Sequence, residues 1–280
     1  MKRCYRFGET EIVLCASEGI GQTPARGLFQ AEPDLGGWMV RCALERDFPL
    51  PDTPPLHQEP YCTVWRENGR ESRLLRYCKH GSPWPYCMWS REGREIIMPW
   101  KPEFRGKLSA RQILDALDPF HLLLESGGLV LHASYIQYNG RAILFSGASG
   151  VGKSTQAALW EACRGAEVIN GDRALIAAGP DGRFWAHGIC YSGTSGICKN
   201  SSAPLSALVL LEQSPDNRIS RLGGLAALKG LLPKVSYRIW DPEDVANATD
   251  LLSRLLSAVP VFRLECRPDE GAVEALERYL

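Results

Sequence analysis

Residues 147–155 read Gly-Ala-Ser-Gly-Val-Gly-Lys-Ser-Thr and fit the phosphate-binding loop pattern G-x-x-x-x-G-K-[ST]. An apolar run, residues 142–145, precedes this stretch, and a helix-forming segment, residues 156–164, follows it. The resulting order of strand, loop and helix is the context that the motif requires. A glycine-rich turn that matches by accident is the alternative, and this context counts against it. We therefore predict a nucleotide-binding loop.

The loop residues suggest how a nucleotide would be held. Glycines allow backbone N–H groups to point at phosphate oxygens, and the N-terminus of the following helix adds partial positive charge. Lys153 would reach the β- and γ-phosphates, and the Ser154 hydroxyl would bind magnesium, so ATP and Mg²⁺ are the expected cofactors. The predicted nucleotide-binding residues are Gly147, Ser149, Gly150, Val151, Gly152, Lys153, Ser154 and Thr155.

Composition limits the partners. The 280 residues suit one large or two modest domains, and 45% of them are hydrophobic, which is enough for a core. Thirty-two basic residues balance thirty-two acidic ones, so no net field attracts nucleic acid or an anionic membrane. No apolar run approaches the roughly 18 residues of a spanning helix, and the N-terminus lacks the apolar region of a signal peptide. We expect a cytoplasmic protein without nucleic-acid or membrane partners.

Ten cysteines are scattered through the chain without a C-x-x-C pair. Free cysteine behaves as a small hydrophobic residue, so we expect mostly buried, reduced thiols. Zinc binding and a disulfide framework are the alternatives.

Residues 1–105 are predicted to form a β-rich region of unknown role. Strands are expected at residues 11–15, 38–42, 62–65, 73–77, 86–89 and 94–98, and the last four pair as two consecutive hairpins in an antiparallel meander. Aromatic side chains are frequent here. They would form either a ligand platform or, as we favour, part of the core.

Residues 106–280 are predicted to form a second domain, because residues 99–106 combine two prolines and a glycine with charges. Residues 129–136 and 142–146 read as strands joined by a tight turn at Asn139 and Gly140. The strand that leads into the loop is therefore entered from an antiparallel hairpin. The commonest phosphate-binding-loop proteins have parallel neighbours at this strand, so we predict an α/β domain with a mixed sheet.

An acidic residue follows the next predicted strand. Residues 166–170 return as a strand after the loop helix and end in Gly171-Asp172-Arg173. Magnesium chemistry needs a carboxylate near the loop hydroxyl, so Asp172 is a candidate metal ligand beside Ser154. An isolated Asp after a glycine is more often a plain turn residue, but its spacing from the loop favours the metal site.

A segment rich in small and hydroxyl-bearing residues follows at residues 191–202. Such segments bind phosphate or substrate in some proteins and are only turns in others, and the sequence leaves both open. The candidate acceptor-binding residues are Ser192, Thr194, Ser195, Lys199 and Asn200.

These motifs together resemble the catalytic domain of the HPr kinase/phosphorylase family, whose fold is related to that of phosphoenolpyruvate carboxykinase. The resemblance covers the chain from about residue 129 onward. It depends on His132, the turn at Gly140, the loop, and the acidic motif at residues 170–173. Residues 192–197 and 208–213 are similar to smaller HPr-kinase-like proteins found near peptide-modification genes, including kinases of ribosomal-peptide precursors. Residues 1–105 do not match the regulatory domain of the full-length kinase.

The resemblance implies site roles and contains one departure. HPr kinases carry two adjacent Asp residues where this chain has Gly171-Asp172. By position Asp172 would hold magnesium, and His132 becomes the candidate that accepts the proton or orients the γ-phosphate. A histidine hydrogen-bonded in the core is the alternative for His132. Lys199 would be available for transition-state charge. HPr kinases form hexamers, and for this chain a homo-oligomer is an analogy only.

The expected function is an ATP- and Mg²⁺-dependent kinase with Asp172, His132 and Lys153 as catalytic residues, transferring the γ-phosphate to a hydroxyl, preferably a serine of a peptide or small protein. The alternatives are a small-molecule kinase acting on free serine, a sugar or another metabolite, and a nucleotide-gated binding module without transfer activity. Decarboxylation of a four-carbon acid is less favoured, because no set of carboxylate-binding arginines is evident.

Overall fold

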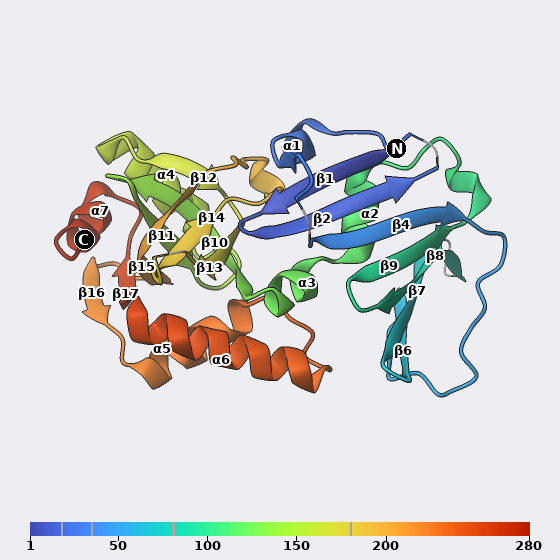
Figure 1. The fold of residues 1–280 in the computed structure, drawn as a ribbon. Helices are drawn as coiled ribbons and strands as arrows, with labels where there is room; N and C mark the ends of the chain where they lie inside the picture. The colour runs from blue at the N-terminus through green and yellow to red at the C-terminus, as the bar shows by residue number, and fades with distance from the viewer. Residues whose placement is uncertain (18, 35, 80–81, 180) are drawn as a thin grey trace. The chain divides into compact units, whose positions relative to one another are not determined.

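The computed structural model describes residues 1–17, 19–34, 36–79, 82–179 and 181–280, and the side chains of these residues except 78, 79 and 82. The chain divides into two compact units, Met1–Pro119 and Phe120–Leu280. Both units are drawn in Figure 1, and each is described by itself.

The division between the units follows the helix α2 (Ala110–Leu117). The sequence placed a boundary between residues 105 and 106, before this helix. In the structure the Gly21 N–H donates to the Leu108 carbonyl, and the Ala110 N–H donates to the Gly21 carbonyl. These bonds tie the start of α2 to the first unit. Ser109 caps the helix as predicted, in a reciprocal capping box with Gln112.

The first unit is built on a nine-stranded sheet in the order β3-β1-β2-β4-β9-β8-β7-β6-β5. The pairs β2–β4 and β4–β9 are parallel, and the other neighbours are antiparallel. The predicted meander is confirmed in β6 through β9. The strands are β1 (Lys2–Phe7), β2 (Thr10–Ala16), β3 (Gln30–Ala31), β4 (Trp38–Leu44), β5 (His57–Gln58), β6 (Cys62–Glu67), β7 (Arg70–Lys79), β8 (Ser82–Glu92) and β9 (Glu95–Trp100), with the helices α1 (Pro24–Gly27) and η1 (Pro102–Phe104) besides α2.

The aromatic side chains of the first unit divide between core and surface. Trp65, Trp89 and Trp100 are buried, as the preferred prediction expected, whereas Tyr77 and Trp84 are exposed.

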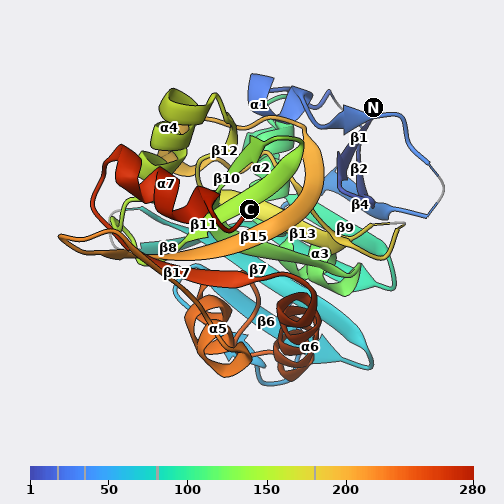
Figure 2. The ribbon, with the colours of Figure 1, turned by 90° about the vertical axis from the view of Figure 1, so that its left-hand side faces the viewer.

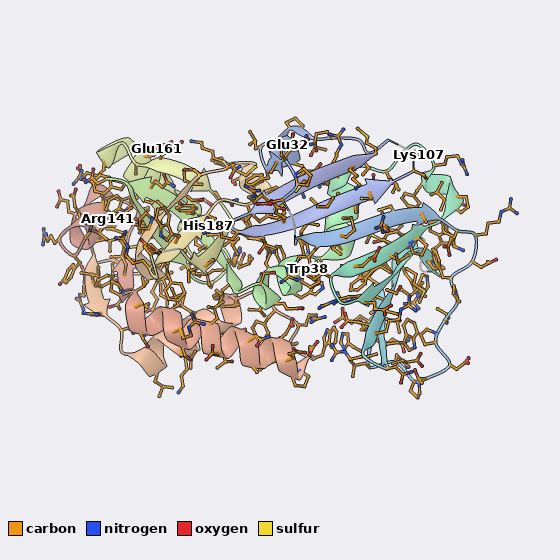
Figure 3. All side chains as sticks on the ribbon, viewed as in Figure 1. Glu32, Trp38, Lys107, Arg141, Glu161 and His187 are labelled. Carbon is orange, nitrogen blue, oxygen red and sulfur yellow. The ribbon has the colours of Figure 1, made fainter. Side chains whose placement is uncertain are left out.

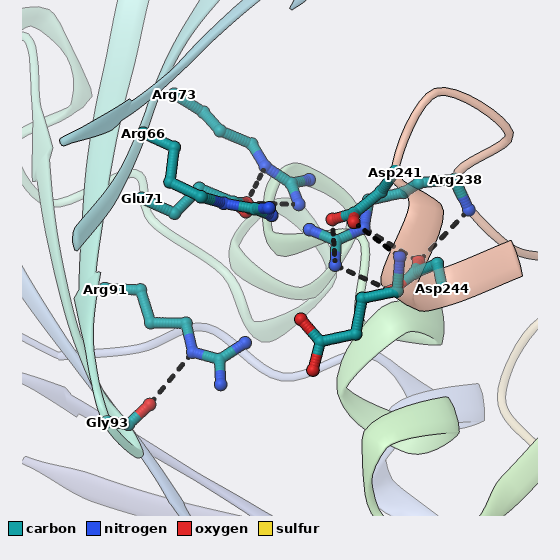
Figure 4. Close-up of polar contacts among 9 residues, drawn as sticks. Arg66, Glu71, Arg73, Arg91, Gly93, Arg238, Asp241 and Asp244 are labelled. Atoms are coloured by element: carbon teal, nitrogen blue, oxygen red, sulfur yellow. Dashed lines mark hydrogen bonds and ion pairs between the residues drawn. The ribbon is translucent and has the colours of Figure 1, made fainter. Parts of the chain in front are cut away.

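Charged groups also lie within this unit. Glu71 of β7 accepts hydrogen bonds from Arg66 and Arg73, as Figure 4 shows.

The second unit is an α/β domain with a mixed sheet, as predicted. Its main strand order is β11-β10-β13-β14-β15-β17-β16, with β12 paired to β10 and an additional pairing of β11 with β15. The strands are β10 (Gly128–Tyr138), β11 (Arg141–Ser146), β12 (Glu167–Asn170), β13 (Arg173–Ala178), β14 (Phe184–His187), β15 (Ser202–Gln213), β16 (Arg218–Arg221) and β17 (Val261–Cys266). The helices are α3 (Phe120–Glu125), α4 (Lys153–Arg164), η2 (Gly193–Ser195), α5 (Gly224–Leu231), η3 (Leu232–Lys234), α6 (Pro242–Ala258) and α7 (Glu270–Glu277).

Two long strands of this unit pair with different neighbours along their length. The first half of β10 pairs with β13 and the second half with β11 and β12. In the same way β15 pairs first with β14 and then with β11 and β17. The five strands β10, β13, β14, β15 and β11 therefore close into a ring. The turn between β10 and β11 has positive φ at both Asn139 and Gly140, as a type I′ hairpin requires.

Helices cover both faces of this sheet. Buried residues of α4 and α7, including Trp160 and Val273, form one hydrophobic cluster with alternate strand residues. Those of α5 and α6, including Leu231 and Leu252, form another with the intervening strand residues. Figure 2 shows α4 and α7 on one side of the strands and α5 and α6 on the other. Charged side chains such as Arg141 and Glu161 are exposed (Figure 3).

A buried polar cluster fixes the start of α6. Asp241 caps the helix by accepting from the Glu243 N–H, and its carboxylate lies 3.0 Å from Arg238. Arg238 also donates two bonds of 2.7 Å to the carboxylate of Asp244 (Figure 4). The planar guanidinium matches such a two-oxygen acceptor, so the chain entering α6 is held in one orientation.

Nine of the ten cysteines have described side chains, and all nine are free thiols; the side chain of Cys78 lies outside the described residues. Within the described chain, no helix has the length and apolar character needed to cross a membrane.

Candidate active site

The glycine-rich loop leads directly from β11 into α4, in the predicted order of strand, loop and helix. A Cβ atom at Gly147 would lie 2.9 Å from the Val151 side chain and 3.1 Å from the Leu211 carbonyl oxygen, and φ at this position is +153°. Gly150 and Gly152 also have positive φ, at +75° and +114°. L-residues rarely adopt these conformations, so the glycines are required for this path of the loop.

Lys153 opens α4 and turns back across the loop. Its side chain is buried, and its Nζ donates to the Ala148 carbonyl oxygen at 3.2 Å. Burial lowers the pKa of Lys153; Lys234 adds to this lowering, and the charge of Asp172 opposes it. The next two side chains, Ser154 and Thr155, are exposed at the N-terminus of the helix. Together with the exposed Ser149, the loop and the start of the helix present one cation and three hydroxyls to any anion bound there.

The structure brings the predicted His132 and Asp172 together. His132 lies on β10, where it pairs with Arg173 at the start of β13, and the Ala133 N–H donates to the Asp172 carbonyl at 2.9 Å. His132 Nδ1 lies 3.3 Å from one carboxylate oxygen of Asp172. Both side chains are partly exposed, at 33% and 24%, so a ligand can reach them.

His132 is held as the neutral imidazole near neutral pH. Burial is the largest cause that lowers the pKa of His132, and the nearby charges of Lys153 and Arg173 lower it further, against the opposing effect of Asp172. In the neutral tautomer with its proton on Nδ1, beside the Asp172 carboxylate, the free lone pair of the ring is on Nε2. This arrangement gives a base that is oriented by a carboxylate.

Two cationic residues that we did not identify from the sequence lie beside this pair. Arg173 Nε is 3.3 Å from the second carboxylate oxygen of Asp172, and its guanidinium lies over the ring of Phe120. Lys234 ends η3 directly before Val235, which forms a bridge with Leu131 of β10, and its charge acts on Lys153. Arg173 was visible as part of the acidic motif, but no sequence signal marks Lys234, about 100 residues further along the chain.

The turn that carries Asp172 is fixed by a buried amide. Asn170 has no exposed surface, and its Oδ1 accepts from the Asp172 N–H at 2.9 Å and from the Arg173 N–H at 3.0 Å. Its Nδ2 donates to the carbonyl oxygens of Ile189 and Tyr191 at 2.8 and 3.1 Å. Asn170 therefore joins the acidic turn to the chain that leads into the hydroxyl-rich segment. Asn170 was recognised in the sequence as part of the motif, but without this role.

The first part of the hydroxyl-rich segment, residues 192–197, packs directly on the acidic turn. A Cβ atom at Gly193 would lie 2.7 Å from Asp172 Cγ, and one at Gly171 would lie 2.2 Å from Ser195 Oγ. The distance at Gly171 explains why this chain has glycine where HPr kinases have the first of two Asp residues, because an aspartate there would overlap Ser195. Of the predicted acceptor-binding residues, Ser192, Thr194 and Ser195 thus lie at the candidate site.

Lys199 and Asn200 lie elsewhere. The backbone N–H of Lys199 donates to Ile169 of β12, and its Nζ lies 2.8 Å from Glu167. Glu167 begins β12, whereas Asp172 follows the other end of this strand, so Lys199 points away from the pair of His132 and Asp172. Asn200 is exposed and comes next along the same path.

Comparisons with known proteins identify the family. The sequence profile described as "SynChlorMet cassette protein ScmC" matches residues 107–267, more than half of the chain. The chain belongs to the ScmC family. The matched span of this ScmC-family chain includes the loop, His132, Asp172 and Lys234. No curated protein sequence matches the chain.

A solved structure also matches this ScmC-family chain. It is the HPr(Ser) kinase/phosphatase from Coxiella burnetii, with 10% sequence identity and a TM-score of 0.30. The match covers 54% of the present chain and 89% of that protein. At this identity and TM-score, the match says nothing about the chemistry of the site.

The ligands available for magnesium are a carboxylate and a hydroxyl. Among the side chains that the structure describes, no three His, Cys, Asp or Glu residues gather into a metal-binding group. Magnesium is commonly held by one or two carboxylates together with substrate phosphates and water. Asp172 and the exposed Ser154 of this ScmC-family chain are side chains of the kind that could hold magnesium in this way, with a bound nucleotide supplying the remaining ligands.

Proposed function

We propose that this chain is an ATP- and Mg²⁺-dependent kinase that transfers the γ-phosphoryl group to a hydroxyl, the serine hydroxyl of a peptide or small protein. One observation carries the proposal. Lys153, at the end of the glycine-rich loop, lies close enough to His132 and Asp172 for their charges to interact, and these two side chains are 3.3 Å apart. A phosphate-binding loop beside an oriented base supplies the two parts that phosphoryl transfer needs.

The nucleotide phosphates would be bound by backbone N–H groups from Gly150 to Lys153 and by the Lys153 ammonium group. Ser154 and Asp172 would hold magnesium, whose chemistry here is to neutralise charge on the phosphate oxygens. Arg173, beside Asp172, and Lys234, whose charge acts on Lys153, add positive charge near the place where the γ-phosphate would lie. Phosphoryl transfer depends mainly on positioning and charge stabilisation, which this set provides.

The acceptor hydroxyl oxygen would attack the γ-phosphorus. The bond from this oxygen to phosphorus forms as the bond from phosphorus to the bridging β,γ-oxygen breaks, and ADP leaves with the electron pair. The hydroxyl proton passes to Nε2 of His132, while Asp172 accepts from Nδ1 and stabilises the imidazolium. His132 thus replaces the acidic base that the resemblance would have placed at Gly171.

The acceptor would enter beside residues 192–197, whose packing against Asp172 brings Ser192, Thr194 and Ser195 close to the transferred group. These exposed or half-buried hydroxyls can hydrogen-bond to the backbone of an extended peptide. The choice of a peptide acceptor follows from the sequence resemblance, and the experiment below therefore includes metabolites.

The proposal is tested with γ-labelled ATP, magnesium, serine-containing peptides encoded near the gene, and a set containing free serine and sugars. We expect label transfer to a peptide. Lys153→Ala and Asp172→Asn should each reduce transfer by about 10²- to 10³-fold, because each removes a charge that stabilises the transition state. Lys229→Ala, which changes an exposed lysine of α5, is the matched control and should leave transfer unchanged.

Retained transfer in either Lys153→Ala or Asp172→Asn would overturn the assigned roles. Saturable transfer to a metabolite in the absence of any peptide would replace the peptide acceptor with a small molecule. Tight ATP binding without transfer to any acceptor would identify a nucleotide-gated binding module instead.

A further inference from the structure

A cleft lies beside the glycine-rich loop. The strands β15 and β17 run parallel to β11, so the segments that follow their carboxyl ends lie at the same edge of the sheet as the loop. These segments and the loop enclose a cleft of about 520 Å³. This volume lies within the roughly 300–1,000 Å³ of small-molecule sites.

The walls of this cleft are suited to a flat group. Pro215 follows β15 and Pro268 follows β17, and Val151 of the loop also lines the space. Gly150 and Gly152 contribute bare backbone. Rigid apolar side chains next to exposed peptide groups favour an aromatic ring that can also form a few hydrogen bonds.

A buried amide faces this cleft without a full set of partners. Gln156, in the first turn of α4, lines the cleft and is only 2% exposed. Its Nε2 donates to Cys266 Sγ at 3.4 Å, whereas its Oε1 has no hydrogen-bond partner among the described residues. A buried carbonyl oxygen without a donor costs about 1–3 kcal/mol. A ligand N–H group in the cleft would remove this cost.

The position of the cleft agrees with the direction of a bound nucleotide. On one side β11 pairs with β15, and the segment that follows β15 lines the cleft. On its other side β11 pairs with β10, which carries His132. The loop at the end of β11 lies between these two sides. A nucleotide with its phosphates in the loop would therefore extend from the cleft on one side to His132 and Asp172 on the other.

We propose that this cleft holds the purine base and ribose of the nucleotide, with the Gln156 carboxamide paired to the edge of the base. The carboxamide presents a donor and an acceptor side by side, and a purine edge offers the complementary pair. This inference rests on the proposed nucleotide-binding function. It assigns Gln156 and Cys266 to the ligand site, which neither the loop motif nor the family resemblance did.

Cys266 provides a readout that does not depend on catalysis. Its thiol lines the cleft and contacts Gln156. We would measure alkylation of Cys266 at fixed pH in the full chain by quantitative mass spectrometry of its peptide, with Mg²⁺-ADP, with Mg²⁺-pyrophosphate, and without ligand. At an ADP concentration about 100 times its dissociation constant, alkylation should slow by up to about 100-fold. Pyrophosphate fills the loop without a base and should not protect Cys266.

Gln156→Leu tests the base contact itself. Loss of the hydrogen-bonding amide should weaken ADP binding about tenfold, while pyrophosphate binding stays the same. Gln137→Leu makes the same change at the end of the β10–β11 hairpin away from the loop, and both affinities should remain unchanged.

The outcomes separate this inference from the proposed function. ADP that binds without protecting Cys266, or pyrophosphate that protects it equally, would overturn the base site and leave phosphate binding at the loop intact. An equal loss of ADP and pyrophosphate affinity in Gln156→Leu would also overturn it, because Gln156 would then act on the loop. If neither ligand binds to the wild-type chain, the proposed function fails, and the base site fails with it.

Discussion

Asn170→Ala provides the sharpest test of how the candidate site is held. The Asn170 side chain makes four hydrogen bonds, all to backbone groups, and no part of it is exposed. Each such bond contributes about 0.5–1.5 kcal/mol, so their combined loss amounts to about 2–6 kcal/mol. We expect a destabilisation in this range, because alanine leaves the four backbone groups without the partner that satisfies them.

The measurement is thermal unfolding of the full chain, followed by a signal from the second unit such as amide hydrogen exchange of β13. A unit of this size loses about 2–4 °C in Tm per kcal/mol, so the shift should exceed about 4 °C. Asn247→Ala, on the exposed face of α6, is the matched control and should not lower Tm, because alanine favours helix more than asparagine does.

Phosphate transfer should fall together with stability in Asn170→Ala. The acidic turn would lose the two bonds that set the direction of Asp172, while the chain at residues 189–191 would lose its link to that turn. A Tm within 1 °C of the Asn247→Ala control, with transfer unchanged, would refute the role that we assign to Asn170.

Three further predictions test the electrostatics and packing of the site. His132 has a lowered pKa, so the acidic limb of the transfer rate against pH should lie below the ordinary histidine range and disappear in His132→Gln. Protonation favours the unfolded chain when the folded pKa is lowered, so wild-type Tm should fall more than that of His132→Gln as pH drops through that range. Lys234→Ala should raise the KM for ATP or lower kcat by about tenfold, whereas Lys199→Ala should match the wild type in steady-state kinetics. Gly171→Asp should lower Tm by the equivalent of about 1–3 kcal/mol, and adding Ser195→Gly should restore part of this loss.

Local patterns in the sequence predicted much of the fold. The apolar runs of β10 and β11, the Asn139-Gly140 turn and the glycines of the loop all act over a few residues, and the structure has each of them where expected. The predicted strands of the N-terminal meander are also present. The boundary after residue 105 was harder to place, because the bonds from Gly21 to the start of α2 connect residues far apart in sequence.

The candidate site was only partly predictable for the same reason. Asp172 was proposed from its spacing to the loop and His132 from the family resemblance, and sheet pairing brings the two side chains to 3.3 Å. Lys234 comes near them through a single bridge to β10, for which no short pattern exists. Lys199 belongs to a lysine-containing segment that looked suitable, but its ion pair with Glu167 depends on the register of the chain along β12. The Gln156 oxygen, which has no partner among the residues that the structure describes, is visible only in three dimensions.

The closed ring of strands has a consequence for how the chain folds while it is being synthesised. The strand β11, which carries the loop, obtains its second neighbour only when residues 205–210 of β15 have been made. A growing chain that has left the ribosome only as far as α4 therefore holds β11 with one edge open, although the loop sequence is complete. Because an open strand edge can pair with another chain, the nascent protein depends on a segment some 60 residues downstream to protect the strand that bears its glycine-rich loop.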